Sequence, residues 1–127
     1  MKNLTFVTIL LVLFGNYSKV FGQTPRQIID SLKLRVEEKL PADQLANMYG
    51  ELGWQYATIN LDSAIFFGKM AVEKAEEAGD PKILAQAFSD LGSGILQKGN
   101  LDESKVLYIK SLQIREQINS HKNQEQN

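Results

Sequence analysis

The sequence contains no cysteine among its 127 residues. Disulfide bonds, thiolate metal sites and a cysteine nucleophile are therefore excluded, and so is a lipid anchor on an N-terminal cysteine. Histidine is almost as scarce, because His121 is the only one and lies in a polar C-terminal stretch. Neither a histidine-based metal site nor a histidine-assisted catalytic triad can be built around it.

The sequence also lacks an excess of basic residues and any motif whose polar side chains would meet in one site. The formal net charge is -1, so nothing favours the neutralisation of phosphates and we expect no binding to nucleic acid. The glycines are scattered and form no phosphate-binding loop. Adjacent acidic residues such as Glu76 and Glu77 point apart on a helix, whereas a catalytic pair has to converge in one cleft. We therefore expect a protein that is not an enzyme, with no catalytic residue, no metal ligand and no cofactor.

Long hydrophobic runs are absent except near the N-terminus. Residues from Leu4 to Phe14 are apolar apart from two threonines, Lys2 precedes them, and Val20 and Gly22 are small residues suited to a cleavage site. This pattern predicts a secretory signal peptide over residues 1–22. The run is shorter than the roughly 20 apolar residues that span a bilayer. We expect an exported protein, periplasmic or secreted, with no membrane segment after cleavage; the alternative is a buried N-terminal strand or helix.

Signals for β-strands are absent from the rest of the chain, which predicts an all-α fold. No segment alternates with period two over more than a few residues, and no Asn-Gly turn separates two apolar runs. A first helix is expected within residues 23–40, because Thr24 and Gln27 form a capping box around Pro25, and Pro41 ends it and opens the next helix.

The remaining helices are delimited by capping residues. Asn60 and Asn100 are suited to begin helices, as is Asp80-Pro81, while Gly79 and Gly99 are suited to end them. The apolar face expected for the last helix includes Leu101, Ser104, Leu107, Tyr108, Ser111, Leu112 and Ile118. Residues 119–127 have nothing to bury and are predicted to form a disordered polar tail.

Two stretches about 40 residues apart carry the same pattern, and a period in this range marks stacked units that cannot each bury an apolar face alone. The first stretch is Tyr49-x-x-Leu52-Gly53-x-x-Tyr56, followed by Ala64 and Ala71, and the second is Phe88-x-x-Leu91-Gly92-x-x-Ile95, followed by Ser104 and Ser111. A glycine inside a helix costs about 0.5–1 kcal/mol relative to alanine, so two glycines at matching places indicate close approach of helices.

These residues resemble the tetratricopeptide repeat, whose pattern is W-x-x-L-G-x-x-Y followed by Ala, an aromatic residue, Ala and Pro. Ile95 and Gly68 depart from that pattern, and the repeats are longer than the usual 34 residues. The resemblance implies an α-solenoid of two antiparallel helical hairpins, 41–79 and 80–118, behind a lead helix at 23–40. It assigns repeat packing to Tyr49, Leu52, Gly53, Tyr56, Ala64, Ala71, Phe88, Leu91, Gly92, Ser104, Tyr108 and Ser111.

The resemblance also implies a concave surface on the first helix of each hairpin. Where some family members place asparagines and lysines that grip a peptide carboxylate, this chain has Gly50, Trp54, Ala57, Thr58, Ser89, Ser93, Leu96 and Gln97. A carboxylate clamp is therefore not expected, and the candidate partner contacts are Trp54, Ser89, Ser93, Leu96 and Gln97. Two positions remain open for Trp54: it anchors a partner, or it packs against the lead helix through Ile29, Leu32 or Val36.

A scaffold of this kind binds protein or peptide without catalysis, which is the function that the resemblance implies. The resemblance is closest to long-repeat arrays at the N-terminus of exported bacterial proteins. In many of these the array leads to a membrane helix and then to a sensor kinase or a DNA-binding regulator. The alternative is thus the N-terminal fragment of a membrane sensor acting in signal transduction. A third alternative is that the uncapped C-terminal repeat pairs with another copy of the chain.

Overall fold

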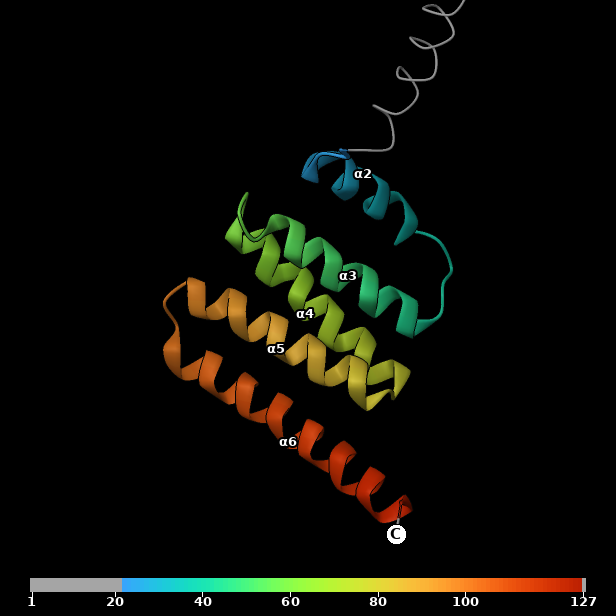
Figure 1. Ribbon diagram of the computed structural model, residues 1–127. Helices are drawn as coiled ribbons and strands as arrows, with labels where there is room; N and C mark the ends of the chain where they lie inside the picture. The colour runs from blue at the N-terminus through green and yellow to red at the C-terminus, as the bar shows by residue number, and fades with distance from the viewer. Residues whose placement is uncertain (1–21, 127) are drawn as a thin grey trace, which may run out of the picture.

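The computed structural model describes residues 22–126, and within them every regular element is a helix, as the sequence predicts. The helices follow in the order α2 (Pro25–Arg35), α3 (Ala42–Tyr56), α4 (Leu61–Ala78), α5 (Pro81–Gln97) and α6 (Leu101–Glu125) (Figure 1). The predicted signal peptide lies outside the described residues except for Gly22. Within residues 22–126, no helix is both long and apolar enough to cross a membrane.

Side chains and glycines at the helix ends explain where the elements begin and end. Asn60 accepts a hydrogen bond from the Ser63 N–H at 2.9 Å, and Asp80 accepts one from the Lys82 N–H at 2.8 Å. Gly79 ends α4 with a φ of 69°, which is a conformation that costs a glycine little. Each polar cap satisfies a backbone group that the helix leaves without a partner.

Helix α2 is shorter than predicted. It begins with the expected capping box, in which Thr24 and Gln27 exchange hydrogen bonds, but it ends at Arg35 instead of continuing toward Pro41. The Val36 N–H still bonds to the Leu32 carbonyl, and the chain then turns. Leu40 precedes a proline, and such a residue is driven away from the helical conformation.

Helix α6 is longer than predicted, because it continues to Glu125, within the segment 119–127 predicted to be a disordered tail. It continues to Glu125 because no glycine or proline follows Gly99 to break it. At its start the Asn100 side chain accepts from the Glu103 N–H at 3.3 Å. The return bond of a full capping box is missing, because Glu103 accepts from the Asn100 side-chain amide, not from its backbone.

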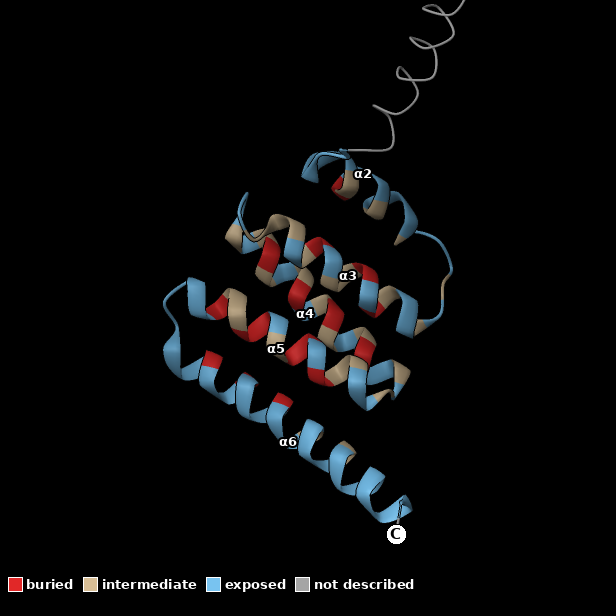
Figure 2. Ribbon diagram, viewed as in Figure 1, coloured by how far each residue is buried: buried red, intermediate tan, exposed pale blue. Residues whose placement is uncertain are grey.

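The helices lie side by side in the order of the chain (Figure 1). Helix α3 packs against α4, α4 against α5 and α5 against α6, while α2 contacts α3, and α3 also reaches α5. Buried residues gather where α3, α4 and α5 face one another, and α6 is exposed along most of its surface (Figure 2). The least exposed core residues are Leu52, Ala71, Ala75, Ala85 and Ser104.

The apolar face predicted for α6 is only partly buried. Ser104, Leu107 and Ser111 face α5, but Leu101, Tyr108 and Leu112 are exposed. Within residues 22–126, α5 is the only helix that packs against α6. One neighbour covers one narrow stripe of a helix, so the rest of the predicted apolar face has nothing to pack against.

Candidate functional site

Small residues let α3, α4 and α5 approach closely, and this approach sets the floor of the candidate site. A Cβ atom added at Gly53 would lie 3.2 Å from the Ala64 carbonyl oxygen. One added at Gly68 would lie 3.1 Å from the Leu91 Cδ1 atom. Both distances are too short for comfortable van der Waals contact, so glycine at these positions allows the helices to touch.

The second hairpin uses hydroxyl groups at the positions where the first uses alanine. The buried Ser104 hydroxyl donates to the Gly92 carbonyl at 2.9 Å, and the buried Ser111 hydroxyl donates to the Ala85 carbonyl at 2.7 Å. The sequence indicated the small size of these residues but not the bonds, which depend on how α6 is placed against α5. Each bond satisfies a buried hydroxyl that would otherwise be costly.

Aromatic rings fill the space beside the glycines in the first hairpin. The Phe67 ring lies between two tyrosines, stacked on Tyr49 with centroids 6.2 Å apart and on Tyr56 at 5.5 Å. Phe67 is absent from the predicted set of repeat-packing residues, although it directly precedes Gly68, which takes the aromatic position of the repeat pattern. Its ring packs on α3, whereas Gly68 faces Leu91 of α5.

Two adjoining hollows lie along α3 and α5, and together we call them the α3–α5 groove; the smaller hollow is also bordered by α4 and by Tyr108 of α6. Their volumes are about 250 Å³ and about 380 Å³. Both are lined by Gly50, Trp54, Ala71 and Asp90. The glycines and alanines on α3 and α4 leave the groove open, since they have no side chains that would fill it.

Trp54 lies at this groove with 73% of its surface exposed, so it does not pack against α2. The position expected next to the lead helix belongs to Tyr56 instead, whose ring lies 5.5 Å from the Lys33 ammonium nitrogen of α2. The sequence left two positions open for Trp54, and in the structure Trp54 occupies the exposed one. The Trp54 indole is thus available to a partner, and aromatic side chains dominate the energetics of interfaces.

The other candidate contacts divide between two places. Ser89, Ser93 and Gln97 line the groove together with Trp54, since they recur on one face of α5. Leu96 does not, because it lies in a separate hollow between α5 and α6 beside Leu101. Helical geometry explains the separation: adjacent residues such as Leu96 and Gln97 point about 100° apart.

Asp90 is a groove residue that the sequence reasoning missed. Among the described residues it is the only charged one that lines the smaller hollow, and it accepts a hydrogen bond from the Gln86 amide at 2.8 Å. Gln86 in turn accepts from the Arg115 guanidinium at 3.1 Å. The sequence feature that could have identified Asp90 is its spacing, because it lies one residue after Ser89 and four after Gln86. This spacing places Asp90 at the edge of the same helix face.

The protein surroundings of Asp90 favour its neutral form. Partial burial of the carboxyl raises the pKa of Asp90, and the Gln86 hydrogen bond and the Arg115 charge act in the opposite direction. Because the pKa is higher in the folded than in the unfolded chain, ionised Asp90 lowers folding stability at neutral pH. This cost in stability disappears as the pH falls through the raised pKa of the folded chain toward the pKa of Asp90 in the unfolded chain.

Metal ligands do not cluster in the part of the chain that the structure describes: residues 22–126 hold no group of three histidine, aspartate or glutamate residues suited to an ion. No protein-family model matches the sequence, and no curated protein or solved structure matches the chain.

Proposed function

We propose that the chain is a non-catalytic scaffold that binds an extended segment of protein or peptide in the α3–α5 groove. The observation that carries this proposal is the position of Trp54, the only tryptophan, exposed beside a groove lined by glycine and alanine. An indole left in water at the edge of a hollow is a typical anchor of a protein interface.

We further propose that the helices form a tetratricopeptide-like α-solenoid of two repeats, 41–79 and 80–118, behind the lead helix. The neighbour-to-neighbour packing of the helices supports this proposal, as does the contact of α3 with α5. In a solenoid each unit contacts only its neighbours, and the first helices of successive repeats line a shared surface. The groove has this position, since α3 and α5 are the first helices of the two proposed repeats.

The groove favours a partner segment with a basic residue. Ser89, Ser93 and Gln97 offer neutral hydrogen-bonding groups, and the only formal charge lining the smaller hollow is the negative charge of Asp90. Trp54 and Asp90 line both hollows. A lysine or arginine side chain held at this point can contact the indole face and the carboxylate together, and a cation over an aromatic ring gains about 0.5–1 kcal/mol when exposed.

Replacing Trp54 with alanine is expected to weaken peptide binding about tenfold or more while leaving the melting temperature nearly unchanged, because the indole packs on little of the protein. The probe is a labelled peptide selected from a random displayed library on the immobilised chain. Its affinity is measured by fluorescence anisotropy, and quenching of Trp54 emission reports binding at the groove in the unmodified chain.

Two further variants make this test specific. Phe66 is exposed but lies on α4 outside the groove, so Phe66→Ala should retain the affinity of the unmodified chain. Asp90→Asn should weaken peptides that carry lysine or arginine and leave neutral peptides unaffected. The proposal fails if Trp54→Ala lowers the melting temperature without changing affinity, or if no selected peptide alters the Trp54 emission.

We also propose that the protein acts outside the cytoplasm, which rests on the sequence of residues 1–22 alone. The exported product is expected to begin at Gln23, and its intact mass checks this directly. Leu11→Arg places a charge within the apolar run and should leave the chain unprocessed in the cytoplasm. An exported product that still contains residues 1–22 would contradict the assignment.

A further inference from the structure

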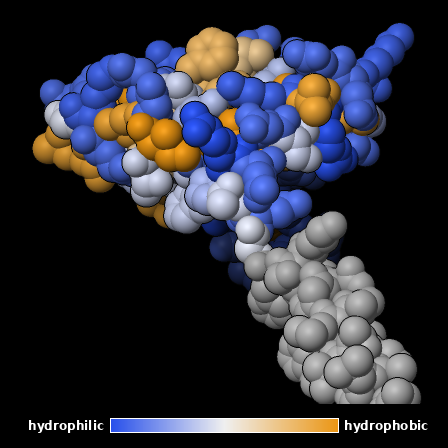
Figure 3. All heavy atoms as spheres, turned by 90° about the horizontal axis from the view of Figure 1, so that it is seen from above, coloured by the Kyte–Doolittle hydropathy of each residue, from blue (hydrophilic) through white to orange (hydrophobic). Residues whose placement is uncertain are grey.

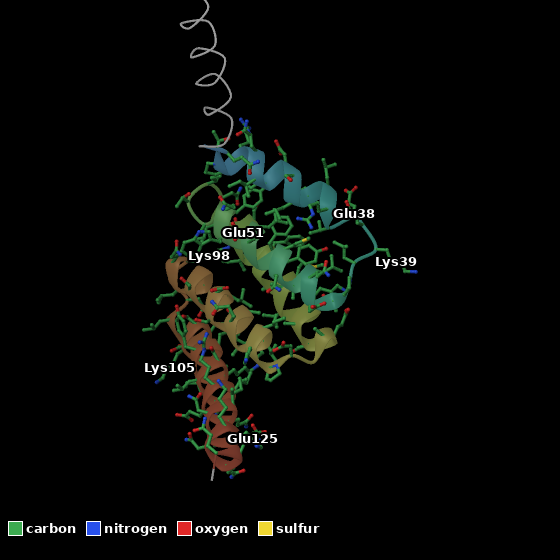
Figure 4. All side chains as sticks on the ribbon, turned by 45° about the vertical axis from the view of Figure 1, so that its right-hand side comes forward. Glu38, Lys39, Glu51, Lys98, Lys105 and Glu125 are labelled. Atoms are coloured by element: carbon green, nitrogen blue, oxygen red, sulfur yellow. The ribbon has the colours of Figure 1, made fainter. Side chains whose placement is uncertain are left out.

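Helix α6 carries an exposed stripe that its own fold leaves uncovered. The residues of this α6 stripe are Lys105, Tyr108, Ile109, Leu112 and Glu116. Tyr108, Ile109 and Leu112 are 38%, 44% and 55% exposed, and Leu101 extends the apolar surface with 66% exposure. Leu96 and Leu101 border a hollow of about 400 Å³ beside the stripe. Figure 4 shows Lys105 projecting from α6 away from the other helices.

One edge of the corresponding stripe of α4 is a helix-packing surface. One repeat earlier in the sequence, Ile65 and Val72 occupy the positions of Lys105 and Leu112, and both pack against the core cluster of α5. Gly68, at the position of Tyr108, meets Leu91 of α5. The edge of the α6 stripe formed by Lys105, Tyr108 and Leu112 therefore has the position of a surface that takes another helix, whereas the α4 residues at the positions of Ile109 and Glu116 are exposed. Among residues 22–126 no helix covers the stripe.

The charged residues at the two ends of the stripe have opposite signs, and neither forms an ion pair within the described residues. Within the described residues the ion pairs are Lys74 with Glu77 and Lys98 with Asp62, so neither Lys105 nor Glu116 has one. The spacing of the charged and apolar positions, 105, 109, 112 and 116, alternates between four and three residues. This is the spacing of the contact positions in paired helices.

We propose that a second copy of the chain covers this surface, with the two α6 helices antiparallel about a two-fold axis between residues 110 and 111. Ile109 then contacts Leu112 of the partner subunit. Lys105 contacts Glu116 of the partner subunit, and the symmetry repeats both contacts. The stripe is self-complementary in this arrangement, because its apolar centre meets an apolar centre and each charge meets its opposite.

Charge decides between this arrangement and the parallel one. In a parallel symmetric pair each residue faces its own copy, so Lys105 would meet Lys105 of the partner subunit and the two Glu116 side chains would also meet. Like charges in direct opposition disfavour pairing. The antiparallel pair replaces both repulsions with attractions. The contact remains narrow compared with a stable interface of about 1,200–2,000 Å², so the dimer is expected to form only at high protein concentration.

Sedimentation velocity on the full-length chain, from low micromolar to millimolar concentration, should show a reversible monomer–dimer equilibrium. Lys105→Glu and Glu116→Lys, made singly, should each weaken the dimer about tenfold, because each replaces two exposed attractive pairs with two repulsive ones. The double variant, Lys105→Glu with Glu116→Lys, should restore the original dissociation constant. High salt should weaken the dimer of the unmodified chain and strengthen the dimers of the single variants.

Matched controls lie on the same helix outside the contact. Lys122→Glu and Glu125→Lys change the same charges beyond the stripe and should leave the dissociation constant unchanged. Ile109→Glu should abolish the dimer, and circular dichroism is expected to show an unchanged helical fold. A chain that remains monomeric at every concentration would overturn the proposal. A dimer in which either single charge reversal has no effect, or in which the double reversal fails to restore binding, would overturn it as well.

Discussion

Replacing Leu52 with alanine is expected to lower the free energy of unfolding by about 2–5 kcal/mol, which is the cost of removing a fully buried leucine and leaving a cavity. Leu52 has no exposed surface and is the largest fully buried apolar side chain of the described residues. A small domain has only about 5–15 kcal/mol of total stability, so this single change removes a large part of it. Urea titration followed by circular dichroism measures the difference.

Leu34→Ala is the matched control for this prediction. Leu34 lies on α2 with 71% of its surface exposed, so the same chemical change removes little buried area there. We expect a change within about 0.5 kcal/mol. If Leu34→Ala and Leu52→Ala lowered the free energy of unfolding equally, Leu52 would not lie at the centre of the core.

Gly92→Ala and Gly92→Leu are expected to change the free energy of unfolding in opposite directions. An added Cβ would lie 3.4 Å from the Leu107 Cβ atom, 3.5 Å from the Ser104 carbonyl oxygen and 3.6 Å from the Tyr108 ring. These are ordinary contact distances, so one methyl group fits. Gly92→Ala should raise the free energy of unfolding by about 0.5–1 kcal/mol through helix propensity. Gly92→Leu should lower it by about 1–3 kcal/mol, because no space remains beyond Cβ.

Gly50 supplies the comparison, since it lies on α3 and has no atom within 4 Å of an added Cβ. Both Gly50→Ala and Gly50→Leu are therefore expected to be neutral or stabilising. Chemical denaturation of the four variants checks the set. Destabilisation by Gly92→Ala would mean that α5 and α6 pack more closely than the structure indicates, and tolerance of Gly92→Leu would mean that they pack more loosely.

The face seen in Figure 3 is mostly hydrophilic, with apolar patches between the hydrophilic residues. The exposed large apolar residues include Trp54 at the α3–α5 groove and Ile109 and Leu112 on α6. Scattered apolar residues on a protein surface are normal, and grouped ones indicate interaction sites. Ile109 and Leu112 belong to a group on α6, whereas Trp54 lies beside a groove lined mostly by small residues. The two proposals assign these surfaces different occupants: a peptide for the groove and a second copy for the stripe.

Much of the helical arrangement could be predicted from local chemistry. Asn60, Asp80 and Gly79 act within one helical turn of their own positions, so their effect does not depend on the rest of the fold. The small size of Ser104 and Ser111 likewise indicated a close crossing before any partner helix was known. The polar segment after Ile118 was predicted incorrectly, because polarity shows that a segment has nothing to bury but not that a helix already formed must end there.

The sequence alone determined that the chain is helical, where most helices begin, and which positions are too small to keep two helices apart, because these properties depend on neighbours along the chain. Only the tertiary structure decided that Tyr56 rather than Trp54 lies next to α2, that Asp90 borders the groove and that Leu96 lies outside it. It also decided that Leu107 is buried on α6 while Leu101, Tyr108 and Leu112 are exposed. The physical reason is that helical periodicity shows which residues share a face, whereas burial of that face depends on which other helices pack against it.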